Sequence, residues 1–452
     1  MKVVADLHLH SKYSRAVSPQ MVLPEMAKWA KRKGIDLLGT GDFTHPLWFR
    51  ELKSQLEQSG EGIYKLKMKP FDSAQGGKEP LFLCTTEISS IYSQGGRGRR
   101  IHTVIFAPSL ETVEKINQEL LRRGANLMAD GRPIIGLSAR DLAELVLGVD
   151  QNCLVIPAHV WTPWFSLYGS ESGFDSIEEC FGNMAKNIFA IETGLSSDPA
   201  MNWRISDIDN RQILSFSDAH SGPKLGRETT VFEVEDTTKL RYADIRNAIR
   251  RQENQASTAP NIVYTTEFYP EEGKYHYTGH RNCQIKQSPE ETRRLGETCP
   301  ACGRHLTVGV MHRVEKLASR NIKCQMTNDK SGTKWVKNEE SPARPPYAML
   351  VPLLEIIAES MRSTPSSQRV INEYNNLTDS FNSEFAVLLE TPAPEIAKIS
   401  GEKVAEGISR VREGKIVVDP GYDGVFGVVK IWGDHGVSAD ESEQKKDQLS
   451  LF

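Results

Sequence analysis

Short apolar runs recur through the first 255 residues, separated by stretches with helical periodicity. The runs do not alternate between polar and apolar residues, which is typical of strands buried on both faces. Seven stand out: VVADLH (3–8), IDLLGTGD (35–42), LFLCTTEI (81–88), IHTVIFA (101–107), CLVIPAH (153–159), IFAIET (188–193) and ILSFSDAH (213–220). Buried strands separated by helices predict an α/β fold with a parallel sheet or barrel.

Helices are predicted at residues 24–33, 111–123, 139–147 and 240–251. Pro24 suits a first helical turn and Gly34 a C-terminal cap. Six of the seven apolar runs carry a His, Asp or Glu at or near their end. Because chemistry collects at the carboxyl ends of barrel strands, we expect an active site there.

The pattern changes near residue 260. Residues 281–344 contain 13 Lys and Arg but 7 Asp and Glu, a local charge of +6. Residues 347–412 read as helical, and IVVDPGYDGVFGVVKIW (416–432) as two strands about a Pro-Gly turn. The last stretch is polar and acidic, which predicts a disordered tail. We therefore expect units at 1–258, 259–345, 346–432 and 433–452.

Composition narrows the class of protein. The chain has 452 residues, a net charge of −4 and 39% hydrophobic residues, as expected for a folded protein of several domains. It has no apolar run of about 20 residues that could span a membrane. The opening MKVVADLHLH lacks the features of a signal peptide. We therefore expect a cytoplasmic protein with no membrane partner.

Histidines and carboxylates suggest a metal centre. His8 and His10 are two residues apart, so both side chains lie on the same face of a strand. Two adjacent imidazoles form half of a typical metal site. Further candidates follow in order along the chain: Asp42, Glu87, His102, His159, Asp218 and His220.

This ordered series resembles the polymerase-and-histidinol-phosphatase superfamily of metal-dependent phosphoesterases. The resemblance implies a distorted (β/α)7 barrel with up to three divalent ions at its mouth, and catalytic roles for His8, Glu87 and Asp218. The first ion would be held by His8, His10, Glu87 and Asp218; Glu87 would bridge to a second ion held by His102 and His159; Asp42 and His220 would hold a third. The family's usual Asp-His pair is absent, because Phe43 follows Asp42. His45 is either its replacement or an ordinary loop residue.

The ligand types suggest the chemistry. Mixed nitrogen and carboxylate ligands suit zinc, manganese or iron, with zinc the default and Mn or Mg as possible activating ions. Closely spaced divalent ions lower the pKa of bound water to about 7 and stabilise a departing phosphate oxygen. We expect hydrolysis of a phosphate ester.

Three longer segments between the predicted ligands resemble one family within this superfamily. AHVWTPWFSLYGSESGFDSIEECF, AIETGLSSDPAMNWRISDIDNR and SDAHSGPKLGRE resemble the endonuclease Q family of prokaryotic repair nucleases, with similarity over residues 1–432. The resemblance implies a double-stranded DNA substrate, cut on the 5′ side of uracil, hypoxanthine, xanthine or an abasic site. Two alternatives stay open: a small-molecule phosphatase of the histidinol-phosphatase type, and a DNA-binding accessory protein with a degenerate barrel.

Residues near the ligands are candidates for DNA contacts, with core packing or solvent exposure as the alternative for each. An enzyme that inspects a base takes it out of the stack, which favours aromatic surfaces. The candidates for stacking are Trp161, Trp164, Phe165 and Tyr168, and those for reading a base carbonyl are Ser170, Ser172 and Glu192. The candidates for phosphate contacts are Lys224, Arg227, and Arg97, Arg99 and Arg100 in a predicted Gly-rich loop.

Two further motifs lie outside the predicted barrel. HRNC (280–283) and CPACG (299–303) have the spacing of a closed structural zinc site with ligands His280, Cys283, Cys299 and Cys302. His276, His305 and Cys324 are alternatives for the fourth ligand. The final QLSLF resembles the peptide by which bacterial repair proteins bind the sliding β-clamp, through Gln448, Leu449, Leu451 and Phe452. It suggests a bacterial, nucleoid-associated protein.

Overall fold

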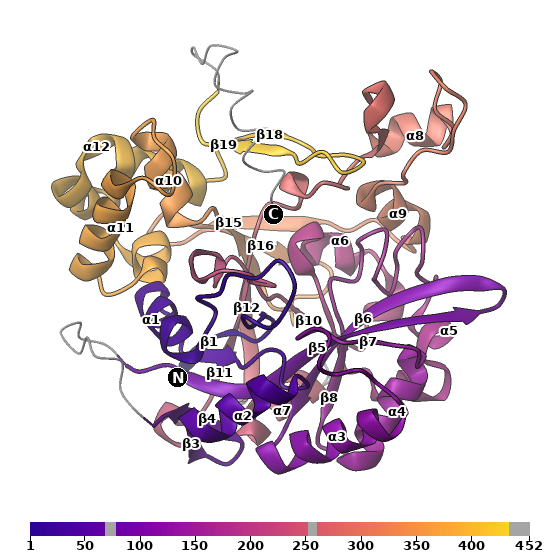
Figure 1. Cartoon of the computed structure of the whole chain (residues 1–452). Helices are drawn as coiled ribbons and strands as arrows, with labels where there is room; N and C mark the ends of the chain where they lie inside the picture. Colours follow the sequence, from indigo (N-terminus) through magenta and orange to yellow (C-terminus); the bar gives the residue numbers. More distant parts are fainter. Residues whose placement is uncertain (68–77, 252–259, 434–452) are drawn as a thin grey trace.

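A 13-stranded mixed sheet lies at the centre of the computed structural model, which describes residues 1–67, 78–251 and 260–433 (Figure 1). Its strands are β1 (Lys2–Asp6), β2 (Leu37–Gly39), β3 (Leu56–Gly60), β4 (Ile63–Leu66), β5 (Leu81–Gln94), β6 (Arg97–Ala107), β7 (Ile134–Ile135), β8 (Leu154–Pro157), β11 (Thr229–Glu233), β12 (Asn261–Glu267), β15 (Cys324–Asn328), β16 (Lys334–Asn338) and β17 (Tyr347–Met349). The main path is β15-β16-β17-β12-β11-β1-β2-β5-β4-β3, while β6 pairs with β5 and β8. The sheet and its helices confirm the predicted α/β class.

Twelve α-helices lie between or after the strands in the described part of the chain. They are α1 (Leu23–Lys33), α2 (Pro46–Gln55), α3 (Leu110–Arg122), α4 (Ala139–Val149), α5 (Ile177–Phe181), α6 (Pro199–Trp203), α7 (Tyr242–Arg250), α8 (Pro289–Leu295), α9 (Val310–Leu317), α10 (Leu353–Ser360), α11 (Gln368–Ser380) and α12 (Ala393–Arg412). The four helices predicted before residue 255 are present as α1, α3, α4 and α7. Gly34 ends α1 in the left-handed conformation at φ 87°, which confirms the predicted cap.

All seven predicted strands form, but their pairing departs from a parallel sheet. The remaining two are β9 (Ala190–Glu192) and β10 (Gln212–Leu214), which pair in parallel, as do β1 with β2 and β2 with β5. The pairs β5–β6 and β6–β8 are antiparallel. The parallel prediction is therefore wrong for this part of the sheet.

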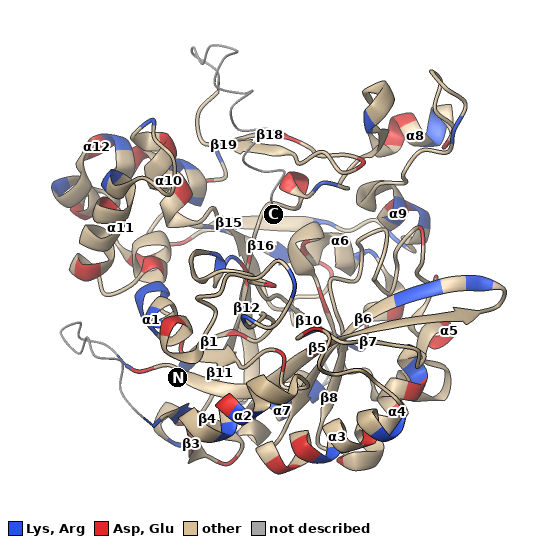
Figure 2. Ribbon diagram, viewed as in Figure 1, with Lys and Arg blue, Asp and Glu red and all other residues tan. Residues whose placement is uncertain are grey.

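A tight turn explains the antiparallel pair. Gly95 and Gly96 link β5 to β6 with φ values of 62° and 74°, the conformation of a two-residue hairpin turn that glycine favours. The hairpin projects from the body of the molecule (Figure 1). Arg97, Arg99 and Arg100 consequently lie on β6, not in the predicted loop. The ribbon of this arm carries blue Lys and Arg segments in Figure 2.

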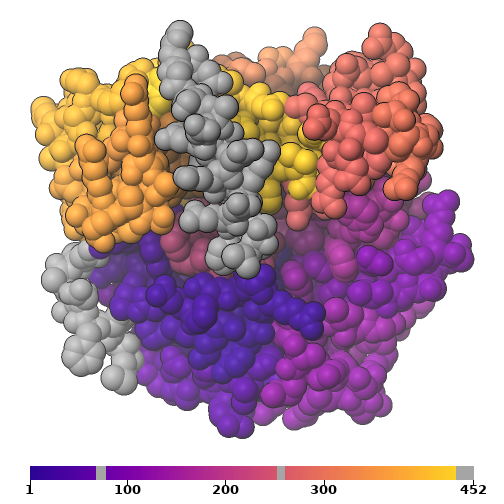
Figure 3. Space-filling model, turned by 45° about the horizontal axis from the view of Figure 1, so that its top comes forward, coloured from indigo at the N-terminus to yellow at the C-terminus, as the bar shows by residue number. Residues whose placement is uncertain are grey.

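The segments after residue 260 extend the sheet and build the opposite side of the molecule (Figure 3). Strand β12 pairs with β11, so the sheet continues past the predicted boundary at 258, which itself lies outside the described residues. Two small antiparallel pairs follow: β13 (Thr278–His280) with β14 (Ile285–Gln287), and β18 (Val417–Asp419) with β19 (Val428–Lys430). The second pair confirms the two strands predicted in 416–432.

The C-terminal helices are tied to the N-terminal part by a buried ion pair. Lys33 of α1 lies 2.8 Å from Glu384, whose carboxylate also accepts a hydrogen bond from the Tyr374 hydroxyl of α11 at 2.8 Å. A buried charge is tolerated only when it is paired, so these contacts fix how the helices sit. Among the described residues, no helix is long and apolar enough to cross a membrane.

Candidate metal centre

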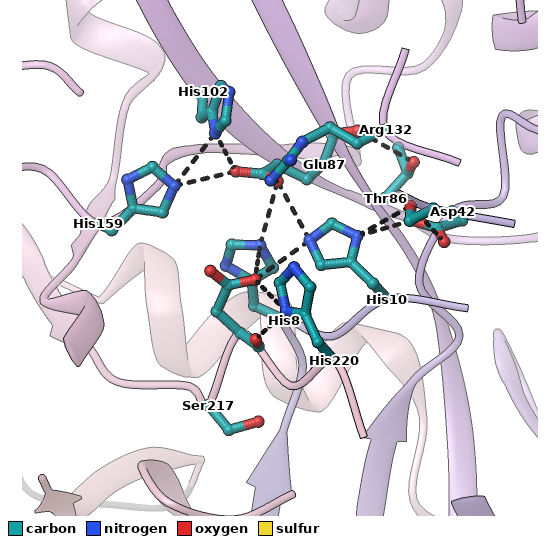
Figure 4. A network of polar contacts seen from close by, with 12 residues as sticks. His8, His10, Asp42, Thr86, Glu87, His102, Arg132, His159, Ser217 and His220 are labelled. Atoms are coloured by element: carbon teal, nitrogen blue, oxygen red, sulfur yellow. Dashed lines mark hydrogen bonds and ion pairs between the residues drawn. The ribbon is translucent and has the colours of Figure 1, made fainter. Parts of the chain in front are cut away.

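Strand ends bring the predicted ligands together. His8 and His10 follow β1, Glu87 lies on β5 and His102 on β6. Of the remaining predicted ligands, His159 follows β8 and His220 follows β10 (Figure 4). Asp218, also after β10, completes the cluster. Leu9 and Ala219 form a parallel bridge, which holds the His8–His10 segment beside the Asp218–His220 segment.

Glu87 stands between two groups of histidines. Its Oε2 lies 3.3 Å from His10 Nε2 and 3.7 Å from His8 Nε2. Its Oε1 lies 2.7 Å from His102 Nδ1 and 3.1 Å from His159 Nε2. One carboxylate oxygen faces each group, which is the arrangement of a bridging carboxylate in a two-metal site.

The first group fits a divalent ion. The Nε2 atoms of His8 and His10 and the Oδ1 of Asp218 are buried and have no hydrogen-bond partner. Asp218 Oδ1 lies 3.1 Å from His10 Nε2 and 3.7 Å from His8 Nε2. Ligand atoms around an ion at about 2.0–2.1 Å are separated by about 3.4 Å in a tetrahedral site. A cation would satisfy three buried atoms that otherwise lack partners.

The opposite ring nitrogens of the two histidines are held by carboxylates. His8 Nδ1 lies 2.8 Å from Glu192 Oε1, and His10 Nδ1 lies 2.9 Å from Asp42 Oδ1. A carboxylate on one ring nitrogen fixes the tautomer in which the other nitrogen offers its lone pair to a metal. Both Nε2 atoms are thereby directed at the same point between Glu87 and Asp218.

Two predicted residues, Asp42 and Glu192, lie behind the histidines. Asp42 is fully buried, and its Oδ2 accepts hydrogen bonds from the Ser11 amide and hydroxyl and from the Ser14 hydroxyl. It meets His10 Nδ1 and belongs to none of the ligand groups formed by described residues, whereas His220 forms one with His10 and Asp218. The third metal held by Asp42 and His220 stays a prediction. Glu192 is 1% exposed and lies behind His8, so it does not face a base. Sequence alone does not show which ring nitrogen a carboxylate will meet.

His220 joins the cluster from another direction. It forms a possible ligand group with His10 and Asp218, and its Nδ1 lies 2.7 Å from the Asp218 carbonyl oxygen. His45, the proposed replacement ligand, is buried and stacks on Tyr13 with ring centroids 4.4 Å apart. It belongs to none of the ligand groups formed by described residues.

The charges around Glu87 keep it ionised. Burial alone would raise its pKa, but His102, Arg132 and His8 hold the pKa well below the usual value. Burial lowers the pKa of His102 to about 4, so its imidazole is neutral and able to bind a metal at neutral pH. Arg132, which no sequence motif marked, places Nη1 3.1 Å from Glu87 Oε2.

Most of the predicted base contacts are engaged elsewhere. Trp161 and Tyr168 are fully buried; the Trp161 indole donates to Asn202 and the Tyr168 hydroxyl to Asp207. They cannot stack on a base, because both side chains fill the interior beneath the loop that follows β8. Trp164 is half-buried with its ring 5.5 Å from that of Tyr275.

Some of the predicted polar DNA contacts are also engaged within the protein, and others are exposed. The Ser170 hydroxyl donates to the Val308 carbonyl, so it is taken up by a contact between segments. Arg227 is half-buried and donates to the Ser217 carbonyl, close to Asp218. Lys224 is exposed, and its contact with a phosphate stays a prediction.

The predicted structural zinc ligands also meet. His280, Cys283, Cys299 and Cys302 each place a ligand atom within 4.8 Å of all the others. Burial would raise the pKa of Cys299, but hydrogen bonds from His280 and from backbone amides lower it to about 6. A thiolate is the form that binds zinc. The clamp-like residues Gln448, Leu449, Leu451 and Phe452 lie outside the described residues.

Parts or all of this chain are similar to known proteins. A family model described as the MJ0043 C-terminal domain matches residues 352–415, which span α10 to α12. The chain is 31% identical over 288 residues to the uncharacterized protein MJ0043 of Methanocaldococcus jannaschii, covering 63% of this chain. It spans only 32% of the length of that relative.

Two solved structures match almost the whole chain. One is the lesion-specific endonuclease PfuEndoQ from Pyrococcus furiosus, with 31% identity, a TM-score of 0.78, and coverage of 98% of this chain and 99% of that one. The other is an endonuclease Q in complex with a 27-mer duplex carrying an abasic lesion, with 32% identity, a TM-score of 0.78, and coverage of 97% and 100%. Fold and site thus define a metal-dependent hydrolase of the polymerase-and-histidinol-phosphatase superfamily. Within it, the chain belongs to the endonuclease Q family.

Proposed function

We propose that this protein is a DNA repair endonuclease that hydrolyses the phosphodiester on the 5′ side of uracil, hypoxanthine, xanthine and abasic sites. The observation that carries the proposal is Glu87, which offers one oxygen to each of two histidine groups in a member of the endonuclease Q family. The abasic-lesion complex of a relative that matches 97% of the chain supports a damaged duplex as substrate.

The centre takes two divalent ions, most simply zinc, with Mn or Mg as alternatives for activity. His8, His10, Glu87 and Asp218 hold one, and Glu87, His102 and His159 hold the other. Bound ions supply a water of lowered pKa and stabilise the departing oxygen. Glu192 and Asp42 orient the histidines, and Arg132 adds a positive charge beside Glu87.

The barrel and the division into units belong to the proposal. The parallel pairs β1/β2, β2/β5 and β9/β10 and the Leu9–Ala219 bridge support a distorted seven-stranded barrel within 1–258. Residues 259–345 then form a basic zinc module and 346–432 a helical domain. The clustered His280, Cys283, Cys299 and Cys302 support one structural zinc.

The C-terminal residues 448–452 are proposed to bind the bacterial sliding β-clamp in the cytoplasm, at the nucleoid. The support is the QLSLF sequence. Deleting these five residues should abolish comigration with purified clamp in gel filtration, while cleavage without clamp stays at the wild-type rate. Full clamp binding by the deletion variant would contradict the assignment.

Cleavage assays on defined substrates test the main proposal. Labelled duplexes with one hypoxanthine, uracil or abasic site should be nicked, and the undamaged duplex left intact, in a reaction that chelation stops. His8→Ala and Asp218→Ala should fold but lose cleavage. Turnover of phosphomonoesters without DNA cleavage would favour the small-molecule phosphatase instead. Equal cutting of damaged and undamaged DNA would also contradict the proposal.

A further inference from the structure

Asp6 connects the first strand to the loop that carries two of the candidate ligands. It is the last residue of β1 and is completely buried. The loop runs from Ser217 to Gly226, between β10 and β11, and contains Asp218 and His220. Asp6 belongs to none of the ligand groups formed by described residues. A buried carboxylate needs compensating hydrogen bonds, and the loop supplies them.

The Asp6 carboxylate binds both ends of this loop. Its Oδ1 accepts a hydrogen bond from the Ser217 amide at 3.1 Å. Its Oδ2 accepts from the Ser217 hydroxyl at 2.6 Å and from the Gly226 amide at 2.8 Å. Because donors from the first and the last residue converge on one side chain, Asp6 closes the loop at its base.

Every polar group of Ser217 has a partner. Asp6 holds its amide and hydroxyl, and the Arg227 guanidinium donates to its carbonyl at 3.2 Å. Ser217 is completely buried and lies next to the ligand cluster (Figure 4). It directly precedes Asp218, and the peptide group between the two residues is planar. The position of Ser217 therefore limits where Asp218 can lie.

The backbone of Asp218 depends on such support. Its φ of 47° lies in the left-handed region, which is uncommon for residues other than glycine. This conformation persists where surrounding contacts impose it. With this backbone, Asp218 Oδ1 is buried without a hydrogen-bond partner, 3.1 Å from His10 Nε2. The contacts that hold the backbone therefore also place a candidate ligand atom.

Backbone contacts hold the next residues of the loop independently of Asp6. The His10 amide donates to the Ala219 carbonyl at 3.0 Å, and the Ser18 amide donates to the His220 carbonyl at 2.9 Å. Neither bond involves the Asp6 side chain. A change at Asp6 should therefore leave the loop attached and release mainly its base, next to Asp218.

We propose that Asp6 is a positioning residue for the first ion, the one held by His8, His10, Glu87 and Asp218. By closing the loop at its base, Asp6 fixes the Asp218 carboxylate opposite the two histidines. The inference rests on the two-ion centre of the proposed function. A carboxylate suits this role because both of its oxygens accept hydrogen bonds. An amide in its place turns an NH2 group towards the backbone amide at one end of the loop, so that a donor faces a donor.

Binding of Mn²⁺ to the full-length protein, after dialysis against a chelator, tests this role. Mn²⁺ favours carboxylate over thiolate ligands, so it should leave the cysteine cluster aside. Electron paramagnetic resonance measures the free ion during the titration. The wild type should bind two Mn²⁺ ions at the centre. Asp6→Asn should bind one of them about 10- to 100-fold more weakly and the other with unchanged affinity, as for other residues that orient metal ligands.

Further variants separate positioning from folding. Ser217→Ala removes one of the three contacts and should weaken the same binding step by a smaller factor. In the double variant the loss should be smaller than the product of the single losses, because both changes break a shared contact. Asp36→Asn is the control: Asp36 accepts from the Val4 amide of β1 at 2.9 Å, so both affinities should stay at wild-type values. Saturating Mn²⁺ should restore cleavage by Asp6→Asn, which a misfolded variant would not allow.

Two results would overturn the role of Asp6. One is wild-type affinity for both ions in Asp6→Asn and in Ser217→Ala. The other is equal weakening of both binding steps, since Asp6 would then act on the whole fold. A wild type that binds two Mn²⁺ ions but cuts no lesion would contradict the proposed endonuclease activity, while the titrations would still decide the role of Asp6.

Discussion

His8 and His10 each use one ring nitrogen for a carboxylate and leave the other buried without a hydrogen-bond partner. The carboxylates come from distant parts of the chain, Glu192 at the end of β9 and Asp42 after β2. Each therefore acts on the metal through a histidine.

Glu192→Gln and Asp42→Asn should each weaken metal binding by about 10- to 100-fold while preserving the fold, because the amide holds the imidazole less firmly in the metal-binding tautomer. Competition with a chromogenic chelator would measure the affinity, with circular dichroism as a check on folding. Asp198→Asn is the control: Asp198 caps α6 through the Met201 amide and touches no histidine, so metal affinity should be unchanged. Wild-type affinity in both test variants would contradict the orienting role.

Most residues of the metal centre could be predicted from the sequence alone. The order of His8, His10, Glu87, His102, His159 and Asp218 was sufficient to predict the ligand cluster, and the structure brings these side chains together. The contacts of Asp42 with His10 and of Glu192 with His8 were not predicted, because they depend on which ring nitrogen each carboxylate meets across the fold. Arg132 was missed because its contact with Glu87 joins residues 45 positions apart, with no motif to mark it.

At the scale of elements, strand positions were predictable and strand pairing was not. Apolar runs located all seven strands, since burial is encoded locally. The antiparallel β5–β6 pair depends on Gly95 and Gly96, whose two-residue turn reverses the chain where a helical crossover was expected. Because of this turn, Arg100 and His102 lie on the same strand, β6, two residues apart.

The cysteine–histidine cluster is a separate element that is expected to depend on its own ion. Cys302→Ser should remove one zinc equivalent per chain, lower the melting temperature and weaken DNA binding, while the ions of the metal centre remain. Elemental analysis of the purified variant measures the loss. Cys324→Ser is the control, because Cys324 lies on β15 and outside the ligand group. An unchanged zinc content in Cys302→Ser would show that the cluster holds no ion.

At the scale of the whole molecule, β12 connects the N-terminal sheet to the later segments. At its end the buried Glu267 carboxylate accepts a hydrogen bond of 2.6 Å from the Ser215 hydroxyl. Burial raises the pKa of Glu267 to about 8, so the folded protein holds a proton there that the unfolded chain, with a pKa near 4.5, releases. Its contribution to stability is present below pH 4.5 and is lost as the pH rises through 8.

Glu267→Gln should therefore remove part of the pH dependence of folding. Between pH 5 and pH 9 the free energy of unfolding of the wild type should fall relative to that of the variant by on the order of 2–5 kcal/mol. The melting temperature of the wild type should fall with it. Thermal melts across this range measure the difference. The exposed Glu57→Gln control should follow the wild type at every pH, and parallel curves for Glu267→Gln would contradict the raised pKa.

The proposed endonuclease activity requires that DNA be cut beside a damaged base. The most direct measurement is the position of the cut in a duplex with one hypoxanthine, labelled at either end and run against a sequence ladder. One nick is expected on the 5′ side of the lesion, absent with chelator and absent from the undamaged duplex. Cutting at positions unrelated to the lesion, or undiminished cutting by Asp218→Ala, would contradict it.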